Sequence, residues 1–162
     1  MWTSNIAWLF YQVHAHDEVK ISSMPYNIKV GEAIAIMKKR MNFYEKGFKA
    51  MKPLFSLGAY LAKSPVEQSL LELVAFRVSQ INGCAYCLDM HSKDLRAHGE
   101  TEQRLYMVDA WRETNLYTDR ERAALAWAEA VTKLENKSVP DDVYEGAARQ
   151  FSEEELIDLR CQ

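Results

Sequence analysis

Residues 72–99 read ELVAFRVSQINGCAYCLDMHSKDLRAHG, with the dipeptide Asn82-Gly83 between two stretches of helical pattern. Before this dipeptide, apolar residues recur every three or four positions, which is typical of an amphipathic helix. After it, a second helix can run from about Cys84 to His98, where Gly99 suits the left-handed position that follows a helix. Because so short a turn folds the second helix back on the first, the stretch predicts an antiparallel helical hairpin.

The start of the first helix has its own signal in Ser64-Pro65-Val66-Glu67. A serine, a proline directly after it and a glutamate three residues after it are typical of an N-cap, a first helical residue and a capping box. We therefore expect the helix to begin at Pro65.

The hairpin brings reactive side chains together. Cys84 and Cys87 are three residues apart and His91 follows four later, so all three share one face of the second helix. Glu72 lies about nine residues before the turn and His91 about eight after it, so the two should face one another. Both cysteines lie in the first helical turn, where free N–H groups and the helix dipole favour a thiolate. The spacing predicts a redox-active thiol pair with a histidine in reach.

The run Glu72, eleven residues, Cys84-Ala-Tyr-Cys87, three residues, His91 resembles the core of the AhpD-like alkylhydroperoxidases, within the carboxymuconolactone decarboxylase superfamily. The resemblance covers roughly residues 41–135. It implies a thiol-dependent peroxidase that reduces organic hydroperoxides through a CxxC dithiol/disulfide cycle. By matching position, Cys87 would attack the peroxide, Cys84 would resolve the sulfenic acid into a disulfide, and Glu72 with His91 would relay protons. Tyr86 stands where the best-studied members carry a second histidine, and its hydroxyl can still hydrogen-bond.

The same resemblance implies a homo-oligomer, a trimer or a hexamer. It also implies a small hydroperoxide as substrate and, as the electron donor, an unknown thiol reductant or redox adaptor protein. No cofactor and no metal are expected.

Composition narrows the class of protein. With 162 residues, 48% of them hydrophobic, the chain is long enough for one helical domain with a sizeable core. A net charge of −3 and the lack of any basic cluster larger than Lys38-Lys39-Arg40 argue against nucleic acid and membrane partners. One CxxC pair and a lone Cys161 do not make a secreted disulfide framework, so we expect a cytoplasmic protein.

The remaining chain divides into an extension and a domain. Residues 1–30 are expected to be a poorly ordered N-terminal extension, and residues 31–162 an all-α, AhpD-like helical domain without strands. An amphipathic helix should run from Gly31 and end or kink at Pro53. Further helices are expected after caps at Thr101, Thr118 and Ser152, and over 141–150. The helix capped by Thr101 should reach about Thr114.

The cysteine cluster is open to interpretations besides thiol redox chemistry. Cys84, Cys87, His91 and His98 could supply four zinc ligands, but the two histidines are about 10 Å apart along one helix, too far for one tetrahedral ion. His98 fits better as a capping charge at the helix C-terminus. The cluster could also be a purely structural cysteine pair, or belong to a lactone decarboxylase-type lyase or to a non-enzymatic redox or interaction protein.

Overall fold

The computed structural model describes residues 43–161, and every regular element in that range is helical. In chain order these elements are α3 (Phe43–Leu61), α4 (Gln68–Asn82), α5 (Ala85–Ala97), α6 (Glu102–Met107), the 3-10 helix η1 (Val108–Glu113), α7 (Asp119–Lys133), the short 3-10 helix η2 (Glu135–Lys137), α8 (Asp141–Ala148) and α9 (Glu153–Arg160). The all-α prediction is confirmed for this range. The predicted extension over residues 1–30 and the predicted domain start at residue 31 lie outside the described residues. None of the described helices is long and apolar enough to cross a membrane.

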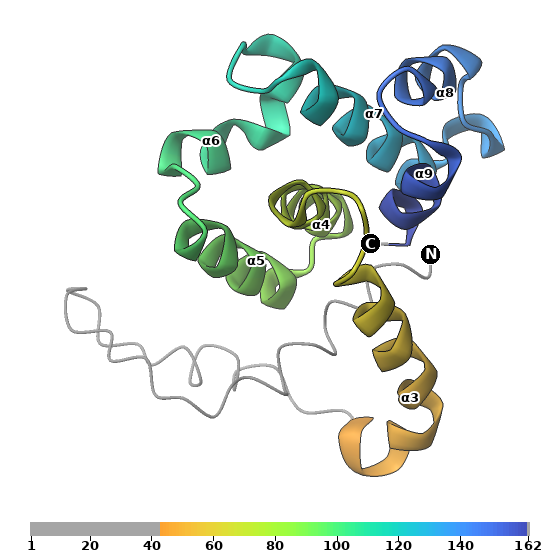
Figure 1. Cartoon of the computed structure of the whole chain (residues 1–162). Coiled ribbons are helices and arrows are strands. Elements are labelled where there is room, and N and C mark those ends of the chain that lie inside the picture. The colour runs from red at the N-terminus through yellow and green to blue at the C-terminus, as the bar shows by residue number, and fades with distance from the viewer. Residues whose placement is uncertain (1–42, 162) are drawn as a thin grey trace, which may run out of the picture.

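Helix α4 lies at the centre of the domain, with α5, α6, α7 and α9 arranged around it (Figure 1). One side of α4 packs Leu71 and Val74 into a core shared with α7, α8 and α9. The other side packs Leu73 and Phe76 into a second core with α5, α6, η1 and α7. Because apolar side chains cover opposite sides of α4, the helix is fixed in position, and so is the turn that follows it.

That turn is made by Gly83, which follows α4 with a positive φ of 63°. Its N–H donates to the carbonyl of Gln80, and the N–H of Cys84 donates to that of Ser79. Cys84 is then the N-cap of α5, and Gly99, with φ 91°, follows that helix. The hairpin and both glycine positions are confirmed. The end of α4 and the start of α5 are thus joined by Gly83 and Cys84, and Cys84 is the first cysteine of the pair.

Changing Gly83 to alanine should lower the free energy of unfolding by about 1–2 kcal/mol, because a side chain at positive φ strains the backbone. A Cβ at this position meets no atom within 4 Å, so the loss comes from conformation and not from a clash. Urea unfolding followed by circular dichroism measures it. Gly146→Ala is the matched control: this glycine is helical, its Cβ would meet Arg149 Nη2 at 3.7 Å, and the change should stabilise slightly. A Gly83→Ala protein as stable as the parent would contradict the argument.

The predicted start of the first hairpin helix is wrong. Helix α4 begins at Gln68 and not at Pro65, and its N-cap is Glu67. The Ser64 hydroxyl instead donates to Asp158 Oδ2 of α9 at 2.5 Å and accepts the Val66 N–H. A partner 94 residues away in the sequence has replaced the local cap.

Helix α3 does not end at Pro53, which lies inside it. Proline removes one N–H donor from the helix, and here the freed carbonyl belongs to Lys49, an exposed residue. Water can satisfy that carbonyl, so the helix continues.

The predicted helix after Thr101 is confirmed at its start, where the Thr101 hydroxyl accepts the Arg104 N–H. It then tightens into the 3-10 helix η1 from Val108. The capping boxes at Thr118 and Ser152 are both present.

Candidate active site

Cys84 and Cys87 form a disulfide at the start of α5, with their Cα atoms 5.4 Å apart. Cys84 Sγ also accepts the backbone N–H of Cys87 at 3.3 Å, as an N-cap side chain does. The two cysteines differ in exposure: Cys84 is partly exposed, whereas Cys87 is only 1% exposed. The pair therefore presents Cys84 to an incoming molecule and encloses Cys87.

His91 lies one turn after Cys87 and is 8% exposed. Burial lowers its pKa to about 4, so the imidazole is neutral at pH 7. Its Nε2 atom is buried and has no hydrogen-bond partner among the described residues. A neutral, enclosed imidazole one turn from a thiol can accept that thiol's proton.

Glu72 lies on α4 and bonds to a histidine other than the one expected. Its Oε2 atom is 2.8 Å from Nδ1 of His98, the C-cap residue of α5. The bond closes the hairpin, since it joins the early part of α4 to the end of α5. It also holds the pKa of His98 above its ordinary value. Within the described residues no hydrogen bond or ion pair joins Glu72 to His91, so a relay between these two stays a prediction.

Tyr86 lies between the two cysteines and is partly buried, with its hydroxyl oxygen enclosed by protein. Its role in the site stays a prediction.

Metal binding gains no support from the geometry. Over residues 43–161, no three or more His, Cys, Asp or Glu side chains are grouped in a way that could hold an ion. Two of the four ligands considered for zinc are joined as a disulfide, and a third, His98, bonds to Glu72.

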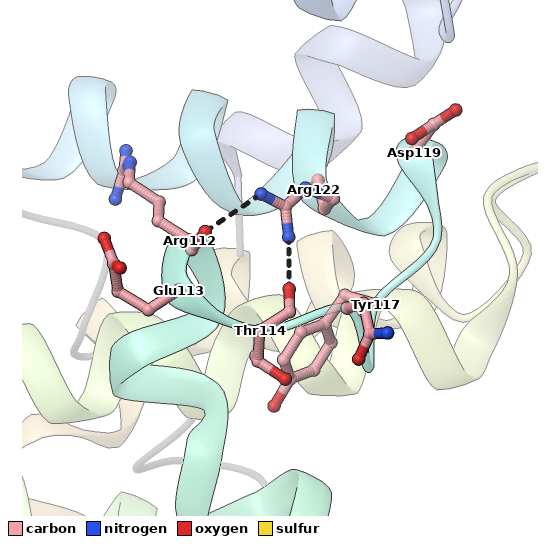
Figure 2. Close-up of a pocket in the computed structure, with 7 residues that line it drawn as sticks. Arg112, Glu113, Thr114, Tyr117, Asp119 and Arg122 are labelled. Atoms are coloured by element: carbon pink, nitrogen blue, oxygen red, sulfur yellow. Dashed lines mark hydrogen bonds between the residues drawn. The ribbon is translucent and has the colours of Figure 1, made fainter.

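A concave feature lies away from the cysteines in the sequence. It is an open pocket of about 680 Å³ formed by the end of η1, the loop after it and the start of α7, and it shares no residue with the disulfide site (Figure 2). Arg122 at its wall donates to the backbone carbonyls of Trp111, Arg112 and Thr114. This guanidinium is therefore used to hold the loop. Nothing in the sequence pattern had indicated the pocket.

A family model described as "Carboxymuconolactone decarboxylase family" matches residues 49–130, about half of the chain. The chain belongs to this family. The AhpD-like resemblance predicted from the spacing of Glu72, Cys84, Cys87 and His91 is thereby confirmed at the level of the family.

Several relatives in the carboxymuconolactone decarboxylase family are similar over different lengths. The uncharacterized protein YdfG of Bacillus subtilis is 41% identical over 123 residues, which is 76% of this chain and 84% of that protein. The alkyl hydroperoxide reductase AhpD of Hyphomonas neptunium is 48% identical over only 40 residues, 25% of this chain and 22% of that protein.

A solved structure from Agrobacterium tumefaciens shares the fold. It is described as a protein of unknown function and a candidate antioxidant defence protein AhpD. It superposes with a TM-score of 0.72 at 39% sequence identity, covering 76% of this chain and 85% of that one.

Proposed function

We propose that this chain is a thiol-dependent peroxidase that reduces small organic hydroperoxides through Cys84 and Cys87. The observation that carries the proposal is the disulfide between these residues, with the buried and neutral His91 one turn after Cys87. A disulfide is the product that such a cycle leaves on the protein. The imidazole is a base beside the cysteine that would attack.

The chemistry balances with these groups. The Cys87 thiol gives its proton to His91, and the thiolate attacks one peroxide oxygen, so that an S–O bond forms and the O–O bond breaks. The departing alkoxide takes the proton from His91 and leaves as an alcohol. The Cys84 thiol then attacks the sulfenic sulfur of Cys87, which forms the disulfide and releases water. Two thiols are oxidised, and one hydroperoxide is reduced to an alcohol and water.

The return step needs a thiol donor, either a small thiol reductant or a redox adaptor protein. Its thiolate would attack Cys84, because Cys84 is the more exposed residue of the pair, and Cys87 would leave as the thiolate. A second thiol of the donor then releases the mixed disulfide. A cytoplasmic location, which we also propose, would supply such donors.

Assembly into a trimer or hexamer is a further part of the proposal. Helix α3 extends away from the other described helices (Figure 1). It carries two exposed aromatic residues, Phe48 and Tyr60. Exposed aromatic surface on a projecting helix is typical of contacts between subunits.

Thiol titration tests the peroxidase directly. The reduced chain has three cysteines, so a thiol reagent should count three. After one equivalent of cumene hydroperoxide, we expect only one thiol, that of Cys161, which is not in the disulfide. A Cys161→Ser protein is the control and should fall from two thiols to none. Three thiols remaining in the parent protein would contradict the proposal and favour the lyase or the interaction protein.

A further inference from the structure

Measured along the hairpin axis from the turn, Glu72 of α4 lies between the positions of His91 and His98 of α5. Counted from Gly83 at 1.5 Å per residue, Glu72 is about 16 Å along α4, whereas His91 and His98 are about 12 Å and 22 Å along α5. The two histidines are seven residues apart, so they lie on the same side of their helix. The carboxylate therefore has one imidazole on each side of it along the hairpin.

The Glu72 carboxylate bonds to His98, although His91 is the more buried of the two histidines. His98 has a side chain that is 56% exposed, so water can satisfy its ring nitrogens. His91 is enclosed, and its Nε2 atom has no partner in the described part of the chain. A buried polar atom without a partner is costly, and a buried imidazolium without a counter-charge is more so.

We propose that His98 is a positioning residue that holds the Glu72 carboxylate away from His91, and that Glu72 moves to His91 when that bond is released. This inference rests on the proposed function, since it is the proton taken from Cys87 that would make His91 a cation in need of Glu72. The Glu72 side chain is flexible, and its position on α4 puts the two imidazoles at similar distances from it along the hairpin axis. His98 then governs when the relay is complete.

The charged groups around His98 and His91 determine which of the two histidines the Glu72 carboxylate bonds to. His98 faces Glu72 from α4 and Asp94 from its own helix. The carboxylates that follow it in the chain are held by arginines, Glu100 by Arg104 and Glu102 by Arg96. For His91, burial alone lowers the pKa, and no charged side chain of the described residues contributes. Protonated His98 retains Glu72, so pH below the raised His98 pKa should keep the carboxylate from His91, and pH above that pKa should release it.

NMR titration of the histidine rings in the full-length oxidised protein tests the exchange. In the parent protein His91 should titrate near 4, and His98 above 6.5. His98→Ala frees the carboxylate, so the His91 pKa should rise from about 4 toward 6.5. His98→Gln keeps an amide donor for Glu72 and should give a smaller rise. Adding Glu72→Gln to His98→Ala should return the His91 pKa to its value in the parent protein.

Glu102→Gln is the matched control, because it breaks an exposed ion pair with Arg96 near the same end of α5. Both histidine pKa values should be unchanged in it. The same His91 pKa in the parent and in His98→Ala would overturn the inference, since the carboxylate would then not be shared. The titration uses no peroxide, so a chain without peroxidase activity would still give this result, and the two failures are distinguishable.

Discussion

A Cys87→Ser protein should react with organic hydroperoxide about 10²–10⁴-fold more slowly than the parent, the range that a positioned acid or base contributes. Cys87 precedes His91 by one helical turn, whereas Cys84 precedes it by two. With Cys87 gone, the remaining sulfur of the pair has no base within one turn. Stopped-flow measurement of thiol oxidation by cumene hydroperoxide gives the rates.

The position of Cys84 at the start of α5 favours it as the nucleophile instead. It is the N-cap of α5, and its sulfur accepts the N–H of Cys87 at 3.3 Å. The dipole is worth about 0.3–1 kcal/mol and a hydrogen bond to a charged group about 1.5–3 kcal/mol. Lowering a thiol pKa also lowers the nucleophilicity of its thiolate, which offsets about half of that gain. What remains is smaller than the roughly 3–5 kcal/mol of a positioned base, so Cys87 is the expected nucleophile.

Cys84→Ser supplies the complementary result. Cys87 should still react but cannot be resolved, so its sulfenic acid should accumulate and be labelled by a dimedone-type probe, as mass spectrometry would show. Cys161→Ser is the control and should behave like the parent protein. Labelling of Cys84 in the Cys87→Ser protein, with none in Cys84→Ser, would exchange the two roles. No labelling in either would favour the lyase or the interaction protein over a peroxidase.

Local signals in the sequence were enough to predict most of the helix ends. Gly83 and Gly99 both have positive φ, and Thr118 and Ser152 both form capping boxes. Each of these signals depends on residues within four positions of one another, and backbone geometry determines the outcome. The hairpin and the face shared by Cys84, Cys87 and His91 follow from the same local rules.

Side-chain pairing over longer distances was not predictable in this way. Helical rise places Glu72 close to the heights of both His91 and His98, and only side-chain conformation and solvation decide which imidazole it meets. The pairing of Ser64 with Asp158 likewise crosses 94 positions and displaced a helix start that local rules favoured. Packing between distant helices supplied partners that no sequence spacing reveals.

The buried ion pair between α4 and α7 is the most extensive pairing that the sequence did not predict. Arg77 donates from Nε to Glu129 Oε1 at 2.7 Å, and both side chains are buried. Trp111 Nε1 at 3.1 Å and Arg112 Nη1 at 2.5 Å donate to the same carboxylate. These residues are spread over 52 positions, and each looks like an ordinary surface charge or core aromatic in the sequence. The carboxylate ties η1 and α7 to the helix that carries Glu72.

Glu129→Ala should therefore lower the free energy of unfolding by about 3–5 kcal/mol, the loss typical of breaking a buried ion pair from one side. It leaves Arg77 enclosed, with Asp109 as its remaining carboxylate, and that side chain is 72% exposed. Urea or guanidinium unfolding at pH 7 measures the loss. Glu102→Ala, which removes an exposed partner of Arg96, is the control and should change the stability little, because exposed ion pairs are weak.

The pH dependence of the same variant gives a second check. Burial by itself would raise the pKa of Glu129, but the hydrogen bonds from Arg112, Arg77 and Trp111 outweigh it, and the pKa lies below 4.5. A lowered native pKa means that the carboxylate stabilises the fold fully above 4.5, and that this contribution is lost as pH falls through the native pKa. The stability gap between parent and Glu129→Ala should therefore narrow in acid. A gap below about 1 kcal/mol at pH 7 would mean that this buried carboxylate contributes no more than an exposed pair.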